Sequence, residues 1–473
     1  MIKELEYAIV DGARGASDLH SSEYYLNIFY YNILKAFSIV QVDNSILVQY
    51  DDVEHVDEVN IVCVFGRGFL ITIHYNLTVY SSLEVTNHEI PIELVNRWKV
   101  DTIRELRCTT FILINIKFML DLKAVNFLKE LLETNSPSGF EKEGVKVFNN
   151  YCSEFSWNDF TDKMGNSVFK VGTGKTKVMI SAHIDELCMM VQGITEQGML
   201  NIISLGGVDK KVLPGSIVKV SRKNYPGEYI TGIIGKKPIH VEYDDKSNGD
   251  IIPFEELLVD IGAESKEEAL ERVEIGSRVV FEANFIDRLG GHRFASKGLD
   301  DKIGVFIVAE VLKNVAKTYS GFFDDYTFYG VANTQEEVGL RGAMVTSKRI
   351  NPDISIDIDV TFATDEGRGI KTESYGDIKL GKGPVIMSGP DKSWNLRCKM
   401  IEVAEINEIP YQLAVSHAGG TNTSAIQEGS IDCETMLISI PQRNMHTQVE
   451  VCDYRDIEGA IDLIYKTLLE ITK

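Results

Sequence analysis

Four short apolar segments in the last three quarters of the chain constrain its fold most strongly. The segments are nearly continuous apolar runs and lie at 177–183 (KVMISAH), 326–333 (YTFYGVAN), 353–359 (DISIDID) and 435–441 (TMLISIP). Strands without an alternating polar face are typical of a sheet covered on both sides. Amphipathic stretches at 304–316 and 457–472 predict covering helices. We therefore expect an α/β fold whose mixed sheet is flanked by helices.

The segment from about 190 to 292 has a different pattern. Compact runs rich in Val, Ile and aromatic residues, separated by Gly turns, occur at 215–220, 227–235, 239–243 and 276–285. Only one helical stretch, 265–273, interrupts them. Such spacing is typical of small all-β units. The sequence thus predicts a β-barrel-like domain at 190–292, inserted into an α/β domain that comprises 119–189 and 293–473.

Residues 1–118 form a third region, for which we expect a small appended α+β unit. Asp43-Asn44 lies between two short apolar runs, 38–42 and 45–50, and this dipeptide is common in hairpin turns. The pattern repeats over 58–75. Helices are predicted over 21–37 and 93–107. This region contributes none of the candidate site residues described below, and its role stays open.

Charge and cysteine content narrow the class of protein. The 473 residues include 48 Lys and Arg against 70 Asp and Glu, a formal net charge of −22, and no dense basic run. Nucleic acid is therefore not expected as a partner, because its phosphates require a basic surface. The seven cysteines form no C-x-x-C pair, which favours thiols in a reducing compartment. An acidic N-terminus and the lack of a long apolar run predict a cytoplasmic protein that does not contact membranes.

Side chains that bind metals follow nearly every predicted strand. They are His183 with Asp185, Asp300 with Asp301, Glu336 with Glu337, Asp357 with Asp359, and His446. Each group alone is weak, because a single His-x-Asp or Glu-Glu is common in solvated turns. Ligands of open α/β sheets bind beyond the carboxyl ends of the strands, so the five groups are expected to converge there.

Two histidines and several carboxylates are a donor set that suits a pair of divalent ions, and zinc accepts both imidazole nitrogen and carboxylate oxygen. Buried acids without a counter-charge are costly, so cations also explain why so many carboxylates meet. Two such ions lower the pKa of a shared water toward neutrality. The pattern therefore indicates a hydrolase.

The motifs HIDE, GLDDKIG, TQEEVGLRGA, DIDVTFATD, AGGTNTSAIQ and IPQRNMHTQVE follow one another in this order. They resemble the motif set of the cytosolic dinuclear metallo-aminopeptidases that assemble into tetrahedral dodecamers. These are the glutamyl, leucyl and deblocking aminopeptidases, some of which have been labelled cellulase or endoglucanase. The likeness covers Met119–Lys473. It implies a zinc-peptidase-like fold in which the 190–292 insertion mediates dimers that build a dodecamer, and short peptides as substrates.

The resemblance also implies a role for each site residue. Two divalent ions, zinc or cobalt, would be held by His183, Asp300, Glu337, Asp359 and His446. Asp300 would bridge the ions, and Glu336 would be the general base. Asp185 would orient the imidazole of His183 from behind. On the residues alone, Asp357 competes with Asp359 for its place, and the resemblance favours Asp359 because it directly precedes Val360-Thr361.

Two alternatives stay open. Related dinuclear folds remove acyl groups from N-acyl amino acids or peptides, and tolerance of a blocked amino terminus separates this activity from an aminopeptidase. The second is a non-catalytic scaffold, in which the appended unit uses an inactive peptidase for assembly. The complete set of predicted ligands and the base favour an active enzyme. Glycoside hydrolysis is disfavoured, because it requires two carboxylates that are free of metal.

Overall fold

The protein is described by a computed structural model that divides into two compact units, Met1–Met119 and Leu120–Lys473. The structure describes the backbone of six strands between 25 and 85. It then describes residues 122–238, 240, 252–318, 323–367, 369–416 and 420–473.

The described part of the first unit consists of strands. These are β1 (Tyr25–Ile28), β2 (Phe37–Val42), β3 (Ser45–Tyr50), β4 (Glu58–Phe65), β5 (Phe69–Asn76) and β6 (Tyr80–Val85). Both hairpins are confirmed, since β2 pairs with β3 across Asp43-Asn44 and β4 pairs with β5. The helix over 21–37 is wrong at β1, which pairs with β4. Tyr and Ile favour strands when a partner strand is present. The helix expected over 93–107 lies outside the described residues.

An eight-stranded mixed sheet forms the centre of the second unit, in the order β20-β19-β21-β18-β9-β17-β8-β7. Its strands are β7 (Trp157–Thr161), β8 (Ser167–Gly172), β9 (Thr176–His183), β17 (Tyr326–Asn333), β18 (Ile354–Phe362), β19 (Val385–Ser388), β20 (Gln412–Val415) and β21 (Glu434–Gln442). The four predicted apolar runs are β9, β17, β18 and β21, which run parallel at its centre. Their carboxyl ends therefore share one edge of the sheet.

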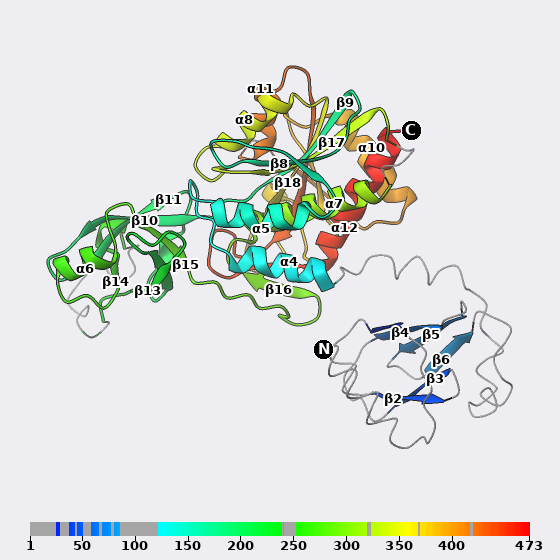
Figure 1. The fold of residues 1–473 in the computed structure, drawn as a ribbon, viewed down its shortest axis with the longest axis horizontal. Helices are drawn as coiled ribbons and strands as arrows, with labels where there is room; N and C mark the ends of the chain where they lie inside the picture. The colour runs from blue at the N-terminus through cyan, green and yellow to red at the C-terminus, as the bar shows by residue number, and fades with distance from the viewer. Residues whose placement is uncertain are drawn as a thin grey trace. The chain divides into compact units, whose positions relative to one another are not determined.

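Helices cover both faces of this sheet (Figure 1). One face packs against α4 (Leu122–Glu133), α5 (Lys142–Cys152), α7 (Leu299–Thr318), α10 (Trp394–Ile406) and α12 (Tyr454–Ile471). The opposite face packs against α8 (Arg341–Ile350) and α11 (Asn422–Gly429). Residues of β9 alternate between the two cores, with Val178 and Ile180 in the first and Met179 in the second. The expected α/β fold with flanking helices is confirmed.

A closed six-stranded barrel follows β9, in the order β10-β11-β14-β13-β12-β15. Its elements are β10 (Cys188–Ile194), β11 (Leu200–Leu205), η3 (Lys210–Val212), β12 (Ile217–Ser221), β13 (Tyr229–Ile234), η5 (Phe254–Glu256), β14 (Leu258–Asp260), α6 (Lys266–Arg272) and β15 (Arg278–Phe281). The inserted barrel is thus confirmed; most of the 239–243 run lies outside the described residues. The chain then returns through β16 (Arg293–Ser296), which pairs with β22 (Glu450–Asp453).

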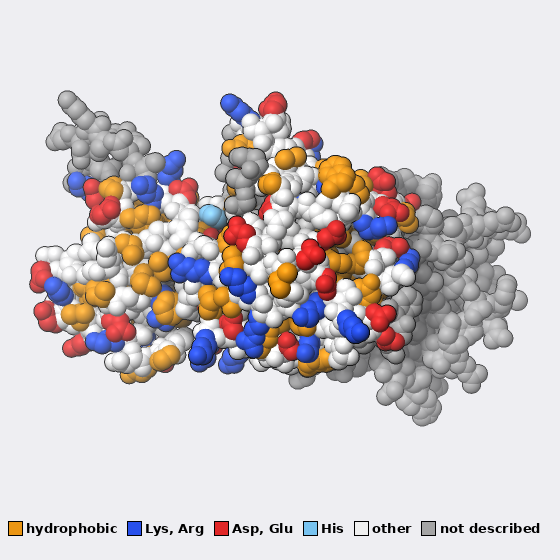
Figure 2. All heavy atoms as spheres, turned by 90° about the horizontal axis from the view of Figure 1, so that it is seen from above, with side chains coloured by type: hydrophobic (Ala, Val, Ile, Leu, Met, Phe, Trp, Pro, Cys, Tyr) orange, Lys and Arg blue, Asp and Glu red, His pale blue; other side chains and the backbone are white. Residues whose placement is uncertain are grey.

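The described surface of the second unit is mixed in charge. Figure 2 shows basic, acidic and apolar side chains interspersed over one face. A short helix, α9 (Thr372–Tyr375), lies in the connection between β18 and β19. Across the described ranges, we find no helix with the length and apolar character needed to cross a membrane.

Candidate metal centre

The sheet brings the predicted site residues together at one edge. His183 is the last residue of β9 and pairs in register with Asn333, the last residue of β17. Glu336 and Glu337 lie in the turn that follows β17, while Asp359 lies near the end of β18. Two sets of potential metal donors have atoms within 4.8 Å of one another: His183 with Asp300 and Glu337, and His183 with Glu336 and Asp359.

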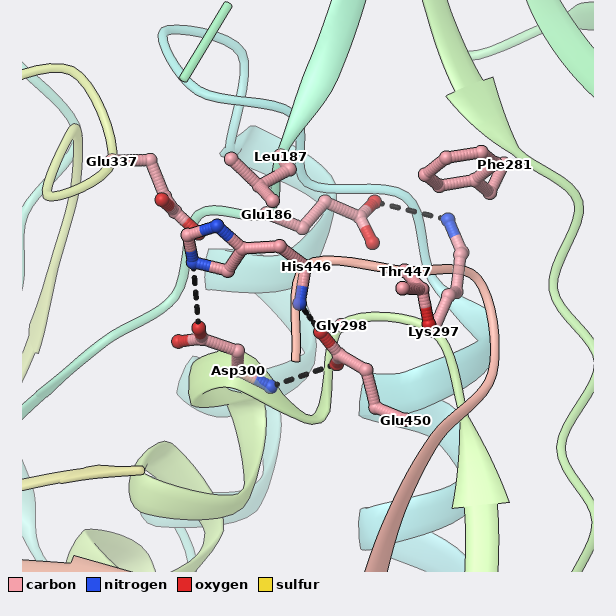
Figure 3. Close-up of a pocket in the computed structure, with 10 residues that line it drawn as sticks. All are labelled: Glu186, Leu187, Phe281, Lys297, Gly298, Asp300, Glu337, His446, Thr447 and Glu450. Carbon is pink, nitrogen blue, oxygen red and sulfur yellow. Dashed lines mark hydrogen bonds and ion pairs between the residues drawn. The ribbon is translucent and has the colours of Figure 1, made fainter. Parts of the chain in front are cut away.

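Asp300 lies between the two histidines. Its Oδ1 is 3.1 Å from His183 Nε2, and its Oδ2 is 3.3 Å from His446 Nε2 (the second pair is drawn in Figure 3). Glu336 Oε2 lies 3.8 Å from His183 Nε2. Each oxygen of Asp300 therefore faces a different imidazole. The Asp300–Asp301 peptide bond is cis.

Asp185 supports the site in a way that the sequence did not indicate. Its two carboxylate oxygens accept hydrogen bonds from the backbone N–H groups of Glu336 at 2.9 Å and Glu337 at 3.2 Å. The carboxylate lies 3.5 Å from His183 Nδ1, whereas the backbone oxygen of Asp185 is closer, at 3.1 Å. Asp185 thus fixes the Glu336-Glu337 turn as well as facing the imidazole.

Two further supporting residues were missed from the sequence. Glu450 accepts hydrogen bonds from the backbone N–H groups of Asp300 at 3.2 Å and His446 at 2.8 Å, and so connects α7 with the segment after β21 (Figure 3). Ser138 donates its hydroxyl to Asp185 at 2.7 Å. Glu450 lies within the IPQRNMHTQVE motif, whereas Ser138 lies in none of the six motifs.

The competing aspartates have different surroundings. Asp357 accepts hydrogen bonds from the hydroxyls of Ser181 at 2.6 Å and Thr423 at 3.4 Å. Asp359 belongs instead to the donor group that includes His183 and Glu336. Hydroxyl donors suit a structural carboxylate, so the geometry favours Asp359 for the metal centre.

The electrostatics of this edge call for positive charge. Burial and, to a smaller extent, the negative charges of Asp359 and Glu337 together raise the pKa of Glu336 to about 9, although His183 partly opposes this shift. Burial also raises the pKa of Asp359 to about 7, together with the negative charge of Asp300. Burial opposes the charged form of His183, but the surrounding carboxylates outweigh it and raise the pKa of the imidazole well above its usual range.

One carboxylate oxygen of this cluster lacks a partner within the described ranges. Glu337 Oε1 is buried and receives no hydrogen bond from the residues that the structure describes, which costs free energy unless another group compensates it. Imidazole nitrogen and carboxylate oxygen are both good ligands for divalent transition metals. The donor set, the raised pKa values and the unpartnered oxygen together fit a divalent metal.

Residues 165–463 match the family of M42 glutamyl aminopeptidases. The chain belongs to this family. It is also 35% identical to the lysyl aminopeptidase of Pyrococcus furiosus over 358 residues, which cover 73% of this chain and 96% of the relative. Family members are metallopeptidases, so the chain is a hydrolase of the aminopeptidase class that uses divalent metal.

Solved structures of family members share the fold. A TET aminopeptidase from a marine sediment archaeon of the Thaumarchaeota has a TM-score of 0.68 and 31% identity, with 73% of this chain and 96% of that chain covered. The TET1 peptidase of Pyrococcus horikoshii has a TM-score of 0.64 and 31% identity, with 72% and 98% covered. That peptidase assembles into a tetrahedron or a large octahedral shell.

Proposed function

We propose that the protein removes N-terminal residues from short peptides with two divalent ions, zinc or cobalt. His183, Asp300 and Asp359 would hold one ion, and Glu337, His446 and Asp300 the other. The observation that carries this proposal is the position of Asp300, whose two oxygens face two different imidazoles at 3.1 and 3.3 Å. A mononuclear site would not need both oxygens in this arrangement.

When bound, the ions would polarise the scissile carbonyl and attract the free amine of the peptide. The residues of the chain would perform the proton transfer. Glu336 would take a proton from the attacking water and return it to the leaving amine. Its backbone is fixed by Asp185, which holds the carboxylate close to His183. Glu336 must be ionised to accept a proton, and nearby divalent ions would favour its carboxylate form.

A cavity of about 560 Å³ supports a proposal for the side chain of the first substrate residue. It adjoins the ends of β18, which contains the proposed ligand Asp359, and of β21, which precedes the proposed ligand His446. Its walls are mostly apolar and include Phe362, Ile370, Tyr375 and Met445, the last of which directly precedes His446. We expect Leu and Phe nitroanilides to be cleaved faster than Glu or Lys nitroanilides. A preference for Glu or Lys would exclude this cavity as the determinant.

We further propose that the barrel mediates dimers that build a dodecamer. Ile217 and Ile233 are directly opposite on neighbouring strands and are 49% and 53% exposed. Exposed apolar side chains that lie together on a surface can mark a contact with another subunit. Light scattering of the purified protein should give a large assembly, and Ile217→Lys with Ile233→Lys should reduce its mass. A wild-type monomer at micromolar concentration would contradict this assembly.

Two variants, one of the proposed base and one of a proposed ligand, test the roles assigned to Glu336 and Glu337. Glu336→Gln should keep two metal ions per chain and lose about 10²–10⁴-fold in kcat, as expected for a missing general base. His446→Ala should lose metal instead. Metal analysis and hydrolysis of aminoacyl-nitroanilides measure both effects. A Glu336→Gln enzyme with full activity, or one that lost an ion, would show that the roles of the pair are assigned wrongly.

The same panel decides between aminopeptidase and deacylase. An aminopeptidase requires a free amine, so acetylated nitroanilides should not be hydrolysed. Faster hydrolysis of the acetylated substrates would favour the deacylase.

A further inference from the structure

Three charged side chains are buried directly beside the metal centre and have no role in the mechanism above. The side chains of Glu186, Lys297 and Lys302 are 4%, 2% and 0% exposed. Each is a near neighbour in sequence of a site residue. Glu186 follows Asp185, Lys302 follows Asp301, and Lys297 lies three residues before Asp300. The three side chains therefore connect two separate parts of the site.

Glu186 accepts from both lysines. Lys297 Nζ lies 3.1 Å from one oxygen of Glu186, and Lys302 Nζ lies 3.1 Å from the other (the first contact is drawn in Figure 3). Glu186 belongs to the turn after β9, whereas both lysines flank the turn that opens α7. The two ion pairs thus join the segment that carries His183 to the segment that carries Asp300.

A third segment completes the contacts. Lys297 donates to Asn135 Oδ1 at 2.7 Å, and Lys302 donates to the backbone oxygen of Thr134 at 2.6 Å. The backbone N–H of Ser136 donates to Glu186 at 2.9 Å. The loop after α4 therefore holds all three charged groups, which leaves them little freedom to move.

The packing around the carboxylate is close. A side chain at Gly298 would bring its Cβ to 2.8 Å from Glu186 Oε2, and Gly298 adopts a φ of +61°. The backbone between Lys297 and Asp300 is therefore held against Glu186 with no space for another residue.

Stability alone does not explain such a cluster. Ion pairs lose hydration when they are buried, and apolar replacements of similar size are often equally stable or more so. Two ammonium groups also exceed one carboxylate, which leaves a positive charge beside a group of buried acids. The geometry favours a role in the neighbouring site.

We propose that Glu186, Lys297 and Lys302 are positioning residues that fix the distance between the His183 turn and the Asp300 turn. This distance would set in advance where Asp300 can bridge two ions. The inference rests on the proposed function, since it concerns the same metal centre. None of the three side chains needs to touch substrate or metal.

The test compares Lys297→Met and Lys302→Met with wild type in zinc titrations of the metal-free protein. Residues that orient metal ligands typically contribute 10–100-fold to metal affinity, and we expect a loss of about this size. In the metal-saturated enzymes, kcat should fall while KM changes little. Zinc affinity and kcat equal to wild type in both variants would overturn the proposal.

Lys392→Met is the matched control. The Lys392 side chain is 1% exposed and lies 2.6 Å from Asp391, so it is also a buried, paired lysine. Asp391 and Ser393 contact Thr435 near the start of β21, at the opposite end of this strand from His446. The control should lose stability without losing zinc affinity. A control that lost zinc affinity equally would reduce the effect to general destabilisation and overturn the proposal.

Glu186→Gln keeps the shape of the side chain and removes only its charge, so it serves if the Met variants fail to fold. This variant should also lower zinc affinity by about 10–100-fold. Unchanged zinc affinity would contradict the positioning role of Glu186, Lys297 and Lys302. Wild-type protein separates the two levels of inference. If wild type bound no zinc, the proposed function itself would fail. If wild type bound two ions and the variants bound them equally well, only the proposed role of the three positioning residues would fail.

Discussion

The α/β part and the barrel of the second unit bury very different residues. Within the described part of the barrel, from 188 to 281, the only buried polar residues are Ser216, Ser221 and Ser277. Its core consists of aliphatic side chains and Phe281. The α/β part, in contrast, buries many Asp, Glu and Lys residues, and a large share of them line the carboxyl edge of the sheet.

This difference shows which part of the chain contains buried charges that destabilise the fold unless they are compensated. Apolar burial stabilises a fold without further conditions, whereas a buried charge requires a partner or a metal. The barrel follows the first rule throughout its described core. The edge of the sheet departs from it at the predicted ligands, so its stability depends on what it binds.

Removal of metal should have the largest effect, and this effect should be confined to the α/β part. Chelation is expected to abolish hydrolysis and to loosen the site, because the buried carboxylates lose their counter-charge. Hydrogen exchange should rise in peptides that contain His183, Asp300, Glu336 and His446, while the barrel strands β12 and β13 stay protected. Zinc or cobalt should restore activity. An equally large increase of hydrogen exchange in the barrel would show that the two parts are not independent.

Truncation of one apolar residue in each part should give a smaller effect. Leu200 in the barrel and Ile358 beside Asp359 are both fully buried. Leu200→Ala and Ile358→Ala should each cost about 2–5 kcal/mol of unfolding free energy, since both leave a cavity. Only Ile358→Ala should also weaken zinc binding. Denaturant titration and zinc titration measure the two effects, and weaker zinc binding in Leu200→Ala would remove the distinction.

The pH dependence of stability should give the smallest effect. Burial raises the pKa of Asp456 to about 7, although the N–H groups of Gly381 and Gly383 partly oppose this shift. The folded protein therefore keeps a proton that the unfolded chain releases near pH 4. The contribution of Asp456 to stability is therefore fully present below this pH and is lost as the pH rises through 7.

Asp456→Asn should flatten this decrease in thermal unfolding between pH 4 and pH 7. Asp260, an exposed residue at the end of the barrel strand β14, is the control, and Asp260→Asn should leave the slope unchanged. An unchanged slope in the Asp456 variant would show that other groups determine the pH dependence.

Long-range contacts explain what the sequence could not predict. The central strands were predictable because buried parallel strands leave continuous apolar runs, as at β9 and β21. The helix over 21–37 failed at Tyr25–Ile28, where pairing with β4 decides the structure. Glu450 and Ser138 were missed because their contacts to Asp300 and Asp185 span 150 and 47 positions. No local spacing encodes such contacts.

The sequence by itself determined the donor types and the edge at which they meet, because the ends of parallel strands converge in any sheet of this class. It also determined the order of the motifs, and with it the family. Only the tertiary structure decided which oxygen of Asp300 faces which imidazole. It also decided that Asp357 accepts hydrogen bonds from hydroxyl groups, and that Glu186 pairs with two lysines. These outcomes depend on strand register and side-chain direction, which are set when distant segments pack together.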